Sequence, residues 1–184
     1  MTEQAKENNF AYIDAQNVNM AIQNQRWKLD WKKFRIYLTE KYKVERAYMF
    51  IWFIPENQDM YTFFQELWYV LVFKSVLQLH DWETKWNVDA ELVLQAMIDY
   101  DKYSKAVIVT WDWDFACLIS YLYKNDKLLT LIVPNDRRYS IFLKNTAKEK
   151  LDSLSNLRKK LEYRIYKKRS HQSSTNTWPI WSDS

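Results

Sequence analysis

Four aspartates stand where a folded chain can bring carboxylates together. Asp14 ends the first expected strand, and Asp112 and Asp114 directly follow the fourth. Asp89 falls in the first turn of an expected helix that leads into the fourth strand. In an open parallel sheet, ligands bind beyond the carboxyl ends of the strands, where the strand order reverses. If the first and fourth strands are neighbours, as in a 3-2-1-4-5 order, these acids gather at one edge.

Each aspartate also has an ordinary structural interpretation. Asp is a common helix N-cap, the role that Asp112 alone would have, and Asp89 alone would be an acid favoured by the helix dipole. Convergence favours a functional role, because several carboxylates at one edge repel one another unless a cation or a proton intervenes. Hard oxygen ligands suit Mg²⁺ or Mn²⁺ rather than zinc. We therefore expect a site for one of these two ions.

The apolar segments that must position these acids predict an α/β fold. Five continuous apolar runs are typical of strands buried on both faces of a parallel sheet. Helical patterns lie between them, which indicates β-α-β units and a mostly parallel, five-stranded, doubly wound sheet. The five runs are residues 10–14, 46–54, 69–73, 105–110 and 127–133. The clearest helical patterns begin at Met60 and Phe115 and run from about Val88 to Tyr100.

The composition indicates one globular domain. The chain has 184 residues, of which 48% are hydrophobic, and no apolar run approaches the roughly 20 residues that span a bilayer. The N-terminus has no signal-peptide pattern, so we expect a cytoplasmic protein without a membrane partner. Cys117 is the only cysteine, and its apolar neighbours predict a buried thiol. His80 and His171 lie far apart, which argues against zinc and Ser-His-Asp chemistry.

The net charge of +4 hides an uneven distribution. Residues 137–169 contain 12 of the 27 basic residues and only 3 of the 23 acidic ones. Such a segment is either a solvated helix face or, beside an acidic site, a surface that holds a polyanion. Arg158, Lys159 and Lys160 are its candidate nucleic-acid contacts.

Three segments resemble the signature segments of the NYN domain, in the LabA-like branch of the PIN-like nucleases. They are YIDAQNVN (12–19), KWNVDAELVLQAMIDY (85–100) and VIVTWDWDFACLISYL (107–122). The similarity covers roughly residues 9–150, and the order and spacing of the three motifs make it specific. The resemblance implies a three-layer α/β/α sandwich with an acidic pocket that binds Mg²⁺ or Mn²⁺ and, in active members, hydrolyses RNA.

The resemblance also assigns roles to individual residues. It implies that the catalytic and metal-binding cluster comprises Asp14, Asp89, Asp112 and Asp114. Asn17 would contact metal-bound water or phosphate, with a weaker claim for Asn19, and Thr110 would border the pocket. Lys85 is either a phosphate contact or an ordinary solvated lysine. The implied products carry a 3′-hydroxyl and a 5′-phosphate.

The expected function is a metal-dependent endoribonuclease, with RNA as its partner. The alternatives are an RNA-binding module that does not cut and a LabA-like regulatory or interaction protein. Assembly into a homo-oligomer is compatible with the sequence. We expect an N-terminal extension over residues 1–8, the PIN-like domain over 9–163, and a basic, then polar, disordered tail over 164–184.

The sequence departs from the family pattern where glycine is expected. The chain contains 0 glycines and 10 tryptophans, whereas average usage would give about a dozen glycines. Trp111 and Trp113 flank the first aspartate of the third motif, and Ala15 follows the first acid. Further tryptophans at glycine-like positions are Trp52, Trp68, Trp82 and Trp86.

Three causes could account for these tryptophans. Some bacterial lineages read UGA as glycine, so translation with a code that reads UGA as tryptophan would write Trp for Gly. This decoding hypothesis accounts for both the missing glycines and the surplus tryptophans. The second cause is deliberate replacement of glycine. The third is a functional set of aromatic side chains that stack on bases.

Overall fold

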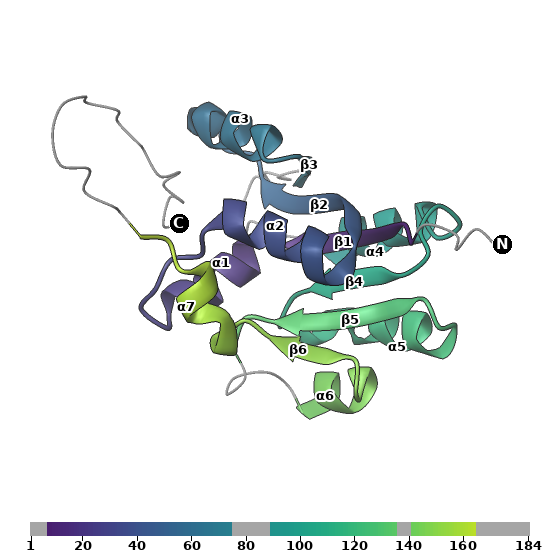
Figure 1. Cartoon of the computed structure of the whole chain (residues 1–184). Coiled ribbons are helices and arrows are strands. Elements are labelled where there is room, and N and C mark those ends of the chain that lie inside the picture. The colour runs from purple at the N-terminus through teal and green to yellow at the C-terminus, as the bar shows by residue number, and fades with distance from the viewer. Residues whose placement is uncertain (1–6, 75–88, 136–140, 165–184) are drawn as a thin grey trace, which may run out of the picture.

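The computed structural model describes residues 7–74, 89–135 and 141–164, which form a six-stranded parallel sheet flanked by helices (Figure 1). The strand order is β3-β2-β1-β4-β5-β6. The strands are β1 (Asn9–Asp14), β2 (Val44–Trp52), β3 (Tyr69–Lys74), β4 (Ala106–Val109), β5 (Leu128–Val133) and β6 (Leu151–Ser153). The expected α/β fold is confirmed, with six strands rather than five.

The two faces of the sheet carry separate hydrophobic cores, because successive side chains of a strand point to opposite faces. Ile13 and Val109 face a core shared with α1, α2, α3 and α7. Tyr12 and Ile108 face a core shared with α4, α5 and α6. These helices are α1 (Ala15–Gln23), α2 (Trp31–Tyr42), α3 (Gln58–Glu66), α4 (Asp89–Ile98), α5 (Ala116–Lys124), α6 (Ile141–Ala147) and α7 (Arg158–Leu161). The architecture is therefore a three-layer α/β/α sandwich.

The strand order reverses between β1 and β4, which lie side by side. Ile13 pairs with Val109 in parallel register, so Asp14 is level with Thr110 on the neighbouring strand. After β1 the chain enters α1 on one face, and after β4 it enters α5 on the other. The two connections part at this point, which is where open α/β sheets bind ligands.

One side chain on α5 differs from the expectation drawn from the sequence. Cys117 is exposed on α5, so the prediction of a buried thiol is wrong. Leu118, Ile119 and Leu122 form the buried side of this helix, and Cys117 lies off that side. In the described part of the chain, every helix is too short or too polar to cross a bilayer. The tail expected to be disordered lies, beyond residue 164, outside the described residues.

Candidate active site at the carboxyl edge of the sheet

Asp14 is a buried carboxylate at the carboxyl end of β1. It is 2% exposed, and α1 begins at the next residue. The Asn17 side chain, one turn into α1, donates a hydrogen bond from Nδ2 to Asp14 Oδ2 at 3.0 Å. Residues three apart lie on the same side of a helix, so the local backbone itself aims the amide at the carboxylate. Asp14 does not cap α1 with its side chain.

The loop after β4 presents the second set of polar groups. Thr110 is fully buried, and its hydroxyl oxygen accepts a hydrogen bond from the Asp112 backbone N–H at 3.1 Å. Asp112 Oδ1 in turn accepts the Asp114 backbone N–H at 3.0 Å and so caps the short helix η2 (Trp113–Phe115). Asp112 therefore has its ordinary capping role, which engages one of its two carboxylate oxygens. Asp114 is exposed.

Asn17 joins the two sets. Its side-chain oxygen accepts a hydrogen bond from the Trp111 indole N–H, while its amide nitrogen donates to Asp14. One side chain therefore connects the end of β1 with the loop after β4, although Asn17 and Trp111 are 94 residues apart. The structure thus brings Asp14, Asn17 and Thr110 to the same edge as Asp112.

The fourth expected acid begins a helix that runs back across the sheet. α4 packs against β1 and η2. Its last turn lies toward the start of β1, because Tyr103 donates a hydrogen bond to the Ala96 carbonyl and packs its ring 5.8 Å from that of Phe10. The first residue of α4, Asp89, therefore lies toward the carboxyl edge. Its side chain, like the whole of Lys85, lies outside the described residues.

The donor chemistry of this edge fits a hard divalent ion. Its described donors are the carboxylates of Asp14, Asp112 and Asp114 and the hydroxyl of Thr110, all of them oxygen ligands that suit Mg²⁺ or Mn²⁺. Across residues 7–74, 89–135 and 141–164, no three acidic, histidine or cysteine side chains lie together as a metal site. The three described aspartates therefore do not complete such a site by themselves.

The basic residues of α7 reach the same edge, because α7 follows the carboxyl end of β6 (Figure 1). Arg158 is largely occupied by structural contacts: its guanidinium pairs with Glu162 at 3.0 Å and donates to the Arg26 carbonyl. The Lys160 ammonium lies 5.2 Å from the centre of the Tyr37 ring. Lys159 is exposed to solvent. Of the three basic residues of α7, Arg158 and Lys160 therefore contact neighbouring elements, and Lys159 adds an exposed positive charge.

The described tryptophans differ in how deeply they are buried. Trp27 and Trp31 are buried in the core beside α2. Trp68 is 81% exposed with a φ of 63°, in the left-handed region that favours glycine. Trp113 is 63% exposed beside the acids. Trp111 and Trp52 are half-buried, and Trp82 and Trp86 lie outside the described residues.

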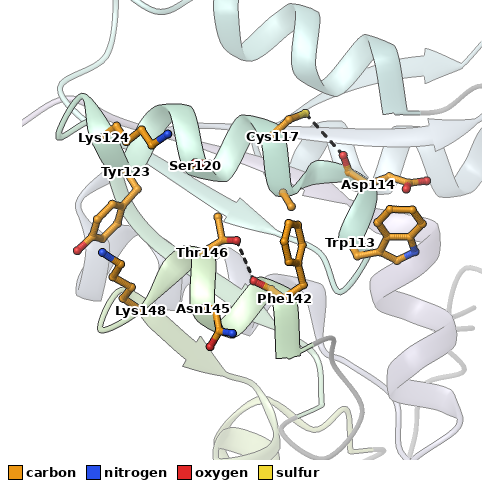
Figure 2. A pocket seen from close by; sticks show the side chains of 11 residues that line it. Trp113, Asp114, Cys117, Ser120, Tyr123, Lys124, Phe142, Asn145, Thr146 and Lys148 are labelled. Atoms are coloured by element: carbon orange, nitrogen blue, oxygen red, sulfur yellow. Dashed lines mark hydrogen bonds between the residues drawn. The ribbon is translucent and has the colours of Figure 1, made fainter.

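A groove of about 810 Å³ lies between α5 and α6 and begins at Asp114 (Figure 2). Its lining also includes Phe142, Tyr123, Lys124 and Lys148. Sequence reasoning did not single out these residues. The available signal was the apolar pair at positions 141 and 142, within the segment rich in basic residues; only the structure shows that both side chains are exposed.

Comparison with known proteins places this geometry in a family. The model of the NYN domain matches residues 11–155. A crystal structure of a protein of unknown function, VPA0982 from Vibrio parahaemolyticus RIMD 2210633, is similar with a TM-score of 0.74 and 19% identity, over 89% of this chain and 100% of that one. At that identity the likeness concerns the fold. No curated protein matches the chain. Because the NYN match spans the strands and loops that carry Asp14, Thr110 and Asp112, the chain belongs to the NYN domain family.

Proposed function

We propose that this NYN-domain protein is a LabA-like ribonuclease that depends on Mg²⁺ or Mn²⁺. The observation that carries the proposal is the buried Asp14 carboxylate, which Asn17 holds level with Thr110, the residue whose hydroxyl binds the Asp112 backbone. These residues lie where the strand order reverses, in a chain that belongs to the NYN domain family, and the resemblance of its motifs to PIN-like nucleases supports a nuclease.

Asp14, Asp112 and Asp89 would hold the ion, with Asp114 at the exposed margin. A divalent ion bound there supplies stabilisation of charge on the scissile phosphate and activation of the attacking water. Asp14 would contribute a carboxylate that is shielded from solvent and held in one orientation by Asn17. Thr110 fixes the backbone of Asp112, and so the position of its carboxylate.

Asn17 has a second role that depends on residue 111. With tryptophan there, the Asn17 side-chain oxygen accepts the indole N–H. With glycine there, as in the family motif, that oxygen would accept a hydrogen bond from a water molecule beside the phosphate instead. The same side chain would then orient Asp14 and the attacking water together. The expected products carry a 3′-hydroxyl and a 5′-phosphate.

A second candidate function is RNA binding without cleavage. It is favoured by the Trp111 indole, whose N–H occupies the side-chain oxygen of Asn17. Residues of α7 would then contribute phosphate contacts that do not depend on sequence.

The test is cleavage and binding of labelled single-stranded RNA and DNA with Mn²⁺, Mg²⁺ or EDTA. We expect Mn²⁺-dependent RNA cleavage that Asp14→Asn abolishes. Asp101→Asn is the matched control, because Asp101 is an exposed aspartate that follows α4. RNA binding without cleavage would favour the second candidate. Absence of both would indicate a regulatory or interaction protein.

A further inference from the structure

We propose that the groove between α5 and α6 binds single-stranded RNA on one side of the scissile phosphate. The inference rests on the proposed function for its orientation, since the groove starts at the acidic edge. Asp114 belongs both to the expected acidic cluster and to the groove lining. In Figure 2, Trp113 and Asp114 lie at one end of the groove, and Tyr123, Lys124 and Lys148 lie at the other.

The lysines give the far end of the groove a positive charge. Lys124 ends α5 and is exposed. The Lys148 ammonium rests 4.9 Å from the centre of the Tyr123 ring, which holds it beside the groove. The Glu149 carboxylate accepts a hydrogen bond from the Tyr123 hydroxyl at 3.0 Å, so it places one negative charge beside the two lysines, whose charge it does not fully offset. A phosphate backbone that leaves the acidic edge along α5 would therefore meet cations after about 13 Å, the length of nine helical residues.

The middle of the groove offers an aromatic surface. Phe142 is 57% exposed, and its ring faces the groove between the acidic end and the lysines (Figure 2). Bases stack on such rings whatever their identity, and a groove that combines cations with exposed aromatics is typical of proteins that bind single strands. Stacking needs a base that is free of its complementary strand, so the occupant is single-stranded rather than duplex.

Polar side chains complete the lining. Ser120 of α5 and Asn145 of α6 also belong to the lining. The Thr146 hydroxyl is already engaged, because it donates to the Phe142 carbonyl at 2.8 Å.

Trp113 is the other exposed aromatic side chain of the groove and lies at its acidic end. Under the decoding hypothesis residue 113 is glycine, which would open the path between the groove and Asp112. We therefore assign the stacking to Phe142.

The test uses charge reversal and truncation in the groove, each with a control on the opposite face of the sheet. Lys124→Glu is matched by Lys32→Glu, and Phe142→Ala by Ile36→Ala, since Lys32 and Ile36 are exposed residues of α2. Affinity for labelled single-stranded and duplex RNA is measured in EDTA, where cleavage cannot interfere, at several salt concentrations.

We expect Phe142→Ala to weaken single-strand binding about 5-fold or more, the effect of one lost stacking contact. Lys124→Glu should weaken binding and lower the salt slope by about 0.7 for its phosphate contact. The α2 controls should bind like the unchanged protein. Photo-crosslinking with 4-thiouridine RNA should label residues 113–124 or 141–148.

Groove variants that bind like their controls would overturn the proposal, as would crosslinks confined to α7. The proposal would also be overturned if Phe142→Ala had a different mass in light scattering from the unchanged protein but the same affinity for RNA. That result would indicate that Phe142 contacts a second copy of this chain. These outcomes are separate from the fate of the proposed activity. If the protein cleaves RNA and the groove variants bind RNA normally, the proposed nuclease activity stands and the proposed RNA-binding role of the groove is wrong. If RNA binding depends on the groove but no cleavage occurs, the binding role stands and the proposed nuclease activity is wrong.

Discussion

Residue 68 offers a direct test of whether glycine belongs where this sequence has tryptophan. Trp68 follows α3 and donates its backbone N–H to the Gln65 carbonyl at 2.9 Å, which closes the helix end. Its φ of 63° lies in the left-handed region. Glycine is the residue that helix ends commonly carry in this conformation. The side chain itself is 81% exposed.

We expect Trp68→Gly to have a larger free energy of unfolding than Trp68→Ala, by about 0.5–1 kcal/mol. Both substitutions remove the same indole, so lost contacts cancel in the comparison. The left-handed conformation costs a residue with a Cβ about 1–2 kcal/mol. The greater freedom of glycine in the unfolded chain offsets about 0.5–1 kcal/mol of this. The remainder corresponds to a Tm difference of about 1–4 °C at this chain length.

The assay is thermal and urea unfolding of both variants, with residue 113 as the matched control. Trp113 is also an exposed tryptophan, but it lies in η2, where the backbone is right-handed. There Trp113→Ala should be the more stable of the two variants, by about 0.5–1 kcal/mol. The reasoning is refuted if Trp68→Ala equals or exceeds Trp68→Gly in stability.

The gene provides an independent test of the decoding hypothesis. Codons 52, 68, 82, 86, 111 and 113 should read TGA. Codons 27 and 31 should read TGG, because those two indoles are buried in the core and are packed as true tryptophans. TGG at the first six positions would refute the decoding hypothesis, while the stability order at residue 68 would still be expected.

The remaining predictions concern the site and its surroundings. Asp14→Asn and Asp112→Asn should each lower Mn²⁺-dependent RNA cleavage strongly while the far-ultraviolet circular dichroism stays unchanged; wild-type rates in both would contradict the assignment. Trp111→Gly should raise the cleavage rate, because it releases the Asn17 side-chain oxygen, and an equal or lower rate would speak against that role. Removal of the charges of α7 should weaken RNA binding at low salt and flatten its salt dependence without a change in cleavage chemistry, so an unchanged slope would make α7 a solvated face. Burial alone would raise the pKa of Asp152, but hydrogen bonds from neighbouring Lys and Tyr side chains outweigh burial, so the pKa of Asp152 in the folded protein is lowered. The ionised carboxylate therefore adds to the free energy of unfolding above the pKa of about 3.9 that Asp has in the unfolded chain. This contribution is lost as the pH falls through the lower pKa of the folded protein. The stability deficit of Asp152→Asn, measured by urea unfolding, should accordingly shrink below about pH 4.

The sequence by itself determined the strands, their parallel arrangement and the position of the acids along the chain. Continuous apolar runs are local signals, and each of the five expected runs became a strand. Asp14 and Asp112 could be placed at strand ends because each directly follows such a run. β6 escaped prediction because it has only three residues, all half-buried, and so carries no apolar run.

Only the tertiary structure decided what meets at the carboxyl edge. The bridge from Asp14 through Asn17 to Trp111 depends on the pairing of β1 with β4, and no local pattern specifies a contact across 94 residues. The same holds for the groove, which exists because α5 and α6 pack side by side on one face of the sheet. The exposure of Cys117 was likewise set by which side of α5 turned toward the sheet. Periodicity reports which residues a helix or strand would bury, whereas register and layer packing decide which surfaces remain open and which distant side chains they share.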